Sequence, residues 1–449
     1  MKKATRQGGF YVANFPILGY YITILQKGAV VMKRSLLEMG KTALIVILLI
    51  SLVLLFAASI PSDVVRNTPW LSTVLKPIGP LLGLPAAELA YVAEAQSVQT
   101  AAQPLTISIR NQAGRYTAQW DFTALDTAYE TLGGLLGQAL DTAEAFTEAR
   151  QFQLTQALSK PSICFDYGFE LPATLAASWL DADCPADETA GSMFVLARES
   201  DQIWLYVSGS TCRRAVTQVN PAEFTALLDQ FSPDGSQFAF EANSHLEPLS
   251  ILPGSVPQLM GAQTESLHSN RYVDALANNL GFNPYDAGRY TDSTGTTHFS
   301  ESGGSLKIST NGQLDFTAST ARITASGTSP ETLVETARSL LAMAVDPVAL
   351  SARLYLSGFT QEGEETTCTF DYVLRGVPVR WADGPAATVV FSGQTVTKLH
   401  VNAVNFSFTD QVQHLLPPVQ TAAILPKDGR LQLQYHVSGS DAAAGWNKQ

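Results

Sequence analysis

The chain has 449 residues, of which 46% are hydrophobic, so it can form two or three packed domains and is too apolar to be disordered. The first 60 residues carry seven Lys or Arg and one acidic residue, a net charge of +6. Since the whole chain has a net charge of −12, the other 389 residues carry −18. A body this acidic repels polyanions, which excludes nucleic acid as a partner.

Residues 1–31 show no clear helical or strand period. Met32 begins the segment MKRSLLEMGK, a basic stretch of the kind that precedes a membrane segment. We therefore expect translation to start at Met32 and residues 1–31 to be an extension from a mis-assigned start codon.

Residues 42–60, TALIVILLISLVLLFAASI, contain no charged side chain. As a helix they would span about 28 Å, close to the thickness of the hydrocarbon core of a bilayer. Lys33, Arg34 and Lys41 precede them, and positive charge marks the cytoplasmic side. We therefore predict a cytoplasmic tail at 32–41, one transmembrane helix at 42–60, and an extracytoplasmic body held at the cell membrane.

A cleavable signal peptide is the alternative, because Ala57, Ala58 and Ser59 resemble a cleavage site. The apolar run is long for a signal peptide, so we expect a retained anchor in the lipid bilayer. Small and polar residues mark the side on which a membrane helix contacts another helix. The candidates for that contact are Ser51, Ala57, Ala58 and Ser59.

Residues 61–104 are rich in Pro and Ala and are predicted to form a stalk. Residues 105–260 follow as the first extracytoplasmic α+β domain. Two strand-like runs flank a turn at 111–114, and apolar residues at spacings of three and four predict a helix over 125–143. A second helix is expected near 147–158, before four strand-like runs and a short helix that begins with Pro.

A helix followed by an antiparallel meander is predicted twice in the rest of the chain. Residues 261–328 contain a helix and four strand-like runs, two of them joined by Asn311-Gly312, a strong hairpin signal. Residues 329–449 contain a second helix, capped by Ser329, and a further set of strand-like runs. We predict an α+β fold in which helices cover one face of each antiparallel sheet.

The stretch 290–299, YTDSTGTTHF, is dense in hydroxyl groups and contains Asp292 and His298. Such side chains can serve catalysis, but they are also the ones that turns use, because they bond their own backbone. We expect Tyr290 and Phe299 to lie on strands and residues 292–295 to form the turn. The six histidines are scattered along the chain, so no metal site, cofactor or catalytic residue is predicted.

Two acidic segments are candidates for a metal-binding or catalytic site. Residues 181–188 hold four acids but lack the glycine and closing glutamate of the usual calcium loop, so a solvated loop is expected. Residues 362–365 are expected to form a hairpin tip. A carboxylate pair from distant strands that cleaves a sugar polymer stays open as an alternative.

All four cysteines lie in the part of the chain that is expected outside the cell, where thiols tend to oxidise. Cys164 and Cys212 fall on predicted strands of one domain and are the candidate disulfide. Free thiols buried in strands are the alternative.

Three short runs resemble the YycH/YycI family: LGFNPYDAGRYTDSTGT at 280–296, SLKISTNGQLDF at 305–316, and FDYVLRGVPVRW at 370–381. The order of tail, membrane helix and helix-plus-meander units is also similar. Members are membrane-anchored extracytoplasmic regulators of the WalK (YycG) sensor histidine kinase in low-GC Gram-positive bacteria. The resemblance implies a non-enzymatic role in two-component signalling and cell-wall homeostasis, with that kinase and a sister regulatory protein as partners.

We therefore expect an extracytoplasmic regulator of a membrane sensor histidine kinase. The alternatives are a cell-wall-acting hydrolase that uses distant paired carboxylates, and a passive wall- or peptide-binding module. The hydrolase predicts paired acids in a cleft, whereas the regulator predicts no such pair and an exposed apolar or aromatic docking patch.

Overall fold

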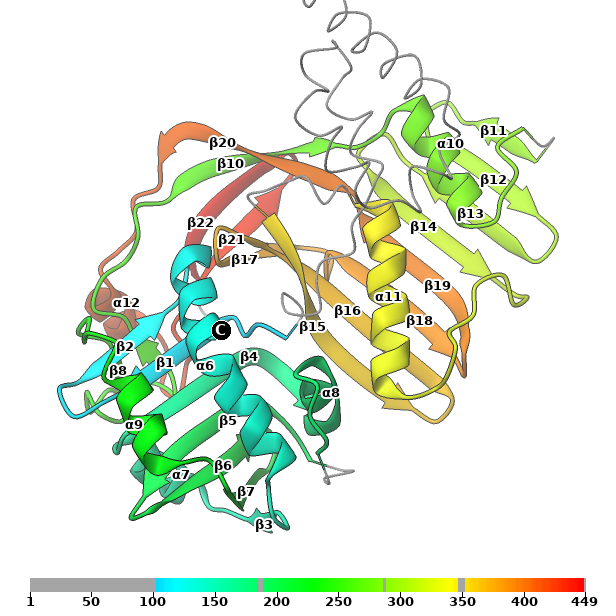
Figure 1. The fold of residues 1–449 in the computed structure, drawn as a ribbon. Helices are drawn as coiled ribbons and strands as arrows, with labels where there is room; N and C mark the ends of the chain where they lie inside the picture. Colours follow the sequence, from blue (N-terminus) through cyan, green and yellow to red (C-terminus); the bar gives the residue numbers. More distant parts are fainter. Residues whose placement is uncertain (1–101, 185–188, 286–287, 346–351, 448–449) are drawn as a thin grey trace, which may run out of the picture. The chain divides into compact units, whose positions relative to one another are not determined.

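The computed structural model describes residues 102–184, 189–285, 288–345 and 352–447, which fall in one compact unit, Ala93–Gln449. The predicted tail, anchor and most of the stalk lie outside these residues. The described residues form seven helices and mostly antiparallel sheets, which confirms the α+β class (Figure 1). None of these seven helices combines the length and the apolarity needed to cross a bilayer.

Seven strands form an antiparallel N-terminal sheet in the order β2-β1-β4-β5-β6-β7-β3. These strands are β1 Thr106–Arg110, β2 Arg115–Ala118, β3 Thr147–Glu148, β4 Ser162–Pro172, β5 Ala190–Glu199, β6 Gln202–Ser208 and β7 Cys212–Thr217. The predicted turn at 111–114 is present, because the Asn111 side chain accepts hydrogen bonds from the backbone of Ala113 and Gly114. The period-two pattern therefore identified the longer strands of this sheet correctly.

Four helices accompany this sheet: α6 Phe122–Asp141, α7 Gln151–Leu158, α8 Ala173–Trp179 and α9 Pro221–Leu228. Asp121 caps α6 by accepting from the Thr123 N–H, and the predicted apolar stripe of α6 is buried. The second predicted helix begins later than expected, because Thr147 and Glu148 pair with β7 as β3. The short helix α8 was not predicted.

Both faces of the N-terminal sheet are covered, whereas the sequence predicted that helices cover one face. Leu154 and Leu158 of α7 pack against Cys164 on one face. Phe194 points to the opposite face and is fully buried as well, and α6 contacts its strand, β5. A sheet buried on both faces positions the helices α6 and α8 that form the site described below.

A second sheet contains thirteen strands and follows the path β11-β12-β13-β14-β19-β18-β16-β17-β21-β22-β10-β20, with β15 paired to β16 beside it. Its strands are β10 Met260–Ser266, β11 Arg289–Thr291, β12 Thr297–Glu301, β13 Gly304–Ile308, β14 Gln313–Ala318, β15 Ala352–Glu362, β16 Glu365–Leu374, β17 Val377–Trp381, β18 Ala387–Ser392, β19 Thr395–Asn402, β20 Val404–Val412, β21 Gln432–Ser438 and β22 Asp441–Asn447. Strands β17 and β21 pair in parallel. A small separate sheet pairs β8 Gln237–Phe238 with β9 Ile251–Leu252.

The two predicted helix-plus-meander units share this one sheet instead of forming a sheet each. Their helices are α10 Asn270–Asn279, α11 Pro330–Ala344 and the short α12 Pro418–Ile424, with Ser269 and Ser329 as the caps of α10 and α11. The meander β11–β14 follows α10 as predicted, and β14 then pairs with β19, so that Leu314 lies opposite Val401. Hydrogen bonding between the two units therefore makes them one structural body.

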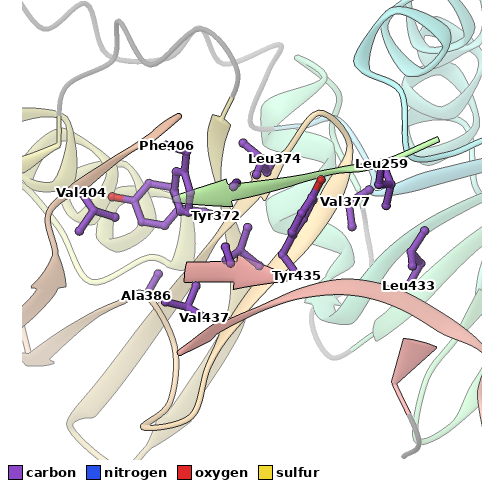
Figure 2. Packing of buried hydrophobic residues seen from close by; sticks show 13 residues of the cluster. Leu259, Tyr372, Leu374, Val377, Ala386, Val404, Phe406, Leu433, Tyr435 and Val437 are labelled. Atoms are coloured by element: carbon purple, nitrogen blue, oxygen red, sulfur yellow. The ribbon is translucent and has the colours of Figure 1, made fainter. Parts of the chain in front are cut away.

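A cluster of buried side chains packs strands β20, β21 and β22 against β16 and β17 of the second sheet (Figure 2). Tyr372 packs edge-on against Phe406 with ring centroids 5.2 Å apart, and its hydroxyl donates to the Asn402 carbonyl. The Tyr435 hydroxyl donates to the Met260 carbonyl at 2.8 Å. Each large side chain buried in this way contributes about 1.5–3 kcal/mol, and both phenol groups keep a partner.

Candidate functional site

A pocket of about 490 Å³ opens beside helix α6, within the size range of small-molecule sites. Its lining comes from α6, from the end of α8, from β15 and from the segment before β1. The described lining residues are Gln103, Asp126, Tyr129, Glu130, Gly133, Gly134, Trp179, Leu180, Asp181 and Arg353. This pocket is the candidate binding site of the protein.

One face of α6 supplies half of the described lining. Asp126, Tyr129, Glu130, Gly133 and Gly134 recur at spacings of three and four, which places them on one side of a helix, next to the buried stripe. A Cβ atom on Gly133 would lie 3.1 Å from the Tyr129 ring, whereas a Cβ atom on Gly134 would meet nothing within 4 Å. Gly133 therefore makes room for the tyrosine ring, and Gly134 leaves open space.

An ion pair joins α6 to β15 at the pocket wall. The Arg353 guanidinium donates to both Asp126 carboxylate oxygens, at 2.8 and 2.9 Å, and lies 4.0 Å from the centre of the Phe122 ring. These hydrogen bonds from Arg353 lower the pKa of Asp126. Gln103 donates to Asp126 and accepts from both Arg353 and the Tyr355 hydroxyl. Asp126 and Arg353 thus neutralise each other inside one hydrogen-bonded network.

Two further carboxylates at the pocket, Glu130 and Asp181, are exposed and have no ion-pair partner among the described residues. The Trp179 indole N–H donates to Glu335 of α11 at 3.2 Å, and Glu335 also pairs with Arg338. The pocket therefore carries an excess of negative charge beside aromatic surface. Its described lining includes no Ser, Thr, Cys, His or Lys, so Asp, Glu and Tyr are the residue types there that could act as a nucleophile.

The stretch 290–299 forms a hairpin, as predicted. Tyr290 lies on β11, Phe299 lies on β12, and Asp292 sits in the turn between them. The Asp292 carboxylate accepts hydrogen bonds from Thr294 and from His298 Nε2, and these bonds lower its pKa. The His298 ring stacks on Tyr290 with centroids 4.6 Å apart. The polar side chains of this stretch therefore stabilise a turn.

The Cys164–Cys212 disulfide considered from the sequence is not formed, and both residues are free thiols. Two strands separate β4 from β7, so the two residues lie about 14 Å apart across the sheet, far more than a disulfide spans. Burial raises the pKa of both thiols. The alternative, free thiols buried in strands, describes Cys164, whereas Cys212 is a free thiol that is half-buried.

The acidic segments do not form a metal site within the described residues. Residues 185–188 of the segment 181–188 lie outside the description, and Asp181 of this segment lines the pocket. Residues 362–365 form the exposed tip of the β15–β16 hairpin, as predicted. No group of three or more His, Cys, Asp or Glu in the described ranges is arranged to hold a metal ion.

Sequence reasoning did not identify the pocket, because its members are far apart in the chain. Arg353 lies 250 positions from Gln103 and 227 from Asp126. The prediction of a helix over 125–143 rests on its apolar residues, which do not indicate a pocket. The predicted membrane contacts Ser51, Ala57, Ala58 and Ser59 lie outside the described residues. Comparison of the chain with family models, with curated proteins and with solved structures finds no match.

Proposed function

We propose that this chain is a non-enzymatic, membrane-anchored extracytoplasmic regulator of a membrane sensor histidine kinase. It would act in cell-wall homeostasis, together with a sister regulatory protein. The uncharged segment 42–60 and the resemblance to the YycH/YycI family support the anchor and the partner. The observation that carries the regulatory role is the pocket, because its paired charges and aromatic walls suit binding.

The position of the pocket supports a role in which binding is passed on. Its walls come from α6 and α8, which accompany the N-terminal sheet, and from β15 of the second sheet. Trp179 also reaches Glu335 of α11 through its indole N–H. A ligand that contacts these elements together stabilises the arrangement in which they meet, which is how a binding protein shifts a conformational equilibrium.

The runs that carry the family resemblance occupy structural junctions of the second sheet. Residues 280–296 and 305–316 contribute to the meander β11–β14. Residues 370–381 form β16, β17 and their turn, where Gly376 approaches the backbone of Trp120 before α6. The resemblance is therefore carried by residues that shape the fold, which supports a shared scaffold for regulation.

A wall-acting hydrolase is the second candidate, since Glu130 and Asp181 are two carboxylates at one pocket. Both are exposed, whereas a general acid for sugar cleavage is kept protonated by apolar surroundings. Loss of a wall-degrading activity in both Glu130→Gln and Asp181→Asn would favour the hydrolase over the regulator.

Ser51→Leu tests the proposed contact side of the anchor. The change removes a small polar residue and adds bulk, so recovery of a copurifying membrane kinase should fall about threefold or more. Leu49→Phe is the matched control, because it also adds bulk, and an ideal helix places residue 49 on the far side from residues 51 and 58 and away from residues 57 and 59. Equal kinase recovery with both variants would count against this contact side.

A further inference from the structure

We infer that the pocket beside α6 binds a small organic cation, an ammonium or guanidinium group on an apolar stem. The inference rests on the proposed function in treating this pocket as the ligand site of the regulator. It names the chemical class of the ligand, which the regulatory role leaves open. Three features of the pocket support it: its charge, its aromatic residues and a helix glycine in its lining.

The charge of the pocket selects a cation. Arg353 is the cation in the described lining, and its bidentate pair with Asp126 leaves no net positive charge for an anionic ligand. Glu130 and Asp181 remain as exposed carboxylates without an ion-pair partner in the described ranges. A cationic ligand in this pocket gains charge-assisted hydrogen bonds, whereas an anionic ligand would meet like charge.

The other residues of the lining suit an organic cation better than a hydrated metal ion. Tyr129 and Trp179 contribute aromatic rings to the lining, and Leu180 contributes an aliphatic side chain. Aromatic faces attract ammonium and guanidinium groups, while an apolar stem gains by leaving water. A metal ion instead needs several oxygen ligands, and no such group occurs in the described part of the chain.

Gly134 is the position of the lining at which a side chain would reduce the space in the pocket. Each glycine in the interior of a helix costs about 1 kcal/mol relative to alanine. Gly133 and Gly137 have packing reasons, since their Cβ atoms would lie 3.1 Å from Tyr129 and 3.4 Å from Leu180. Gly134 has none within 4 Å, and it lines the pocket. Gly134 is exposed, so a side chain at this position would extend into the volume of the pocket.

The test uses the full chain in nanodiscs of zwitterionic lipid, which do not themselves attract amines. Isothermal titration calorimetry measures binding of 1,5-diaminopentane, of pentane-1,5-diol and of glutarate. We expect saturable binding of the diamine, about tenfold or more weaker binding of the diol, and none of glutarate. A capped tripeptide with a central lysine then distinguishes a free amine from a basic side chain as the source of the cation.

Two pairs of variants locate the binding. Gly134→Leu fills the pocket with a helix-forming residue and should weaken diamine binding about tenfold or more, whereas Gln138→Leu adds the same side chain one turn on and should leave it unchanged. Glu130→Gln and Asp181→Asn should each weaken binding about three- to fivefold, the size of one partly exposed ion pair. Glu144→Gln, an exposed carboxylate outside the lining, is their control.

If neither the diamine nor the lysine peptide binds, the inference is overturned. Equal binding of the diol, or undiminished diamine binding in Gly134→Leu, would overturn it as well. Kinase copurification is measured separately on the same preparations. If the cation binds but no kinase copurifies, the ligand site is supported and the proposed partner is not. If a kinase copurifies but the cation does not bind, the partner is supported and the ligand site is not.

Discussion

Arg115→Ala is expected to lower the free energy of unfolding by about 3–5 kcal/mol, as removal of one partner from a buried ion pair does. The Arg115 side chain is 1% exposed and donates to both oxygens of the Glu241 carboxylate, at 2.9 and 3.0 Å. It also donates to the Leu158 carbonyl and lies 4.3 Å from the centre of the Phe238 ring. Alanine would remove two of the hydrogen bonds to the Glu241 carboxylate, which keeps those from Arg110 and from the Phe238 N–H, and it would create a cavity. Urea denaturation of the full chain measures the loss.

Arg110→Ala is the matched control, because Arg110 donates to the same Glu241 carboxylate at 2.7 Å but is 33% exposed. It should cost less than about 1 kcal/mol, as partly solvated pairs do. Equal losses in the two variants would contradict the view that burial, and not the ion pair as such, makes Arg115 important.

The same ion pair predicts a pH dependence. Burial alone would raise the pKa of Glu241, but the hydrogen bond and the charge of Arg115 outweigh it and hold this pKa below its ordinary value of 4.5. A carboxyl group with a lowered pKa in the folded state stabilises the protein above that ordinary value. This stability is lost as the pH falls through the folded-state pKa. Arg115→Ala should flatten this acid-side loss.

Gly376→Ala is expected to destabilise the protein by more than about 3 kcal/mol, through overlap of backbone and side chain. Arg375 and Gly376 form the two-residue turn between β16 and β17, both with positive φ, at 50° and 88°. A Cβ atom on Gly376 would lie 2.5 Å from the Asp121 nitrogen and 2.6 Å from the Trp120 carbonyl carbon. Both contacts are to backbone, so no side chain can move aside.

Gly363→Ala separates this overlap from backbone strain. Gly363 also has a positive φ, 63°, in the β15–β16 hairpin, but its Cβ atom would meet nothing within 4 Å. This variant should cost only about 1–2 kcal/mol, the penalty of a left-handed conformation. A Gly376→Ala protein as stable as Gly363→Ala would mean that the turn and α6 do not meet as described.

Local patterns predicted much of the fold. The cap Ser329 and the hairpin signal Asn311-Gly312 act over a few residues, and both are where the sequence placed them. Strands that were missed lack such patterns: β22, Asp441–Asn447, is a run of alanine and glycine beside one tryptophan. The seven-residue helices α8 and α12 are too short to show a helical period.

Long-range partners were beyond reach from one sequence. The pairing of β14 with β19 joins the two meander units, but no residue in either strand indicates which strand it will pair with. The same holds for the pocket, where Arg353 of β15 meets Asp126 of α6. Strand edges and ion pairs that come together only on folding depend on the tertiary arrangement, which local propensity does not encode.

The most direct test of the proposed regulation is crosslinking in native membranes followed by capture of the full-length chain. It is compared with a chain whose residues 42–60 are replaced by an unrelated membrane anchor. The account predicts that a sensor histidine kinase is recovered with the native anchor and is reduced or lost with the replacement. Recovery of the kinase with both chains would move the contact to the extracytoplasmic body. Recovery with neither chain would contradict the proposed function.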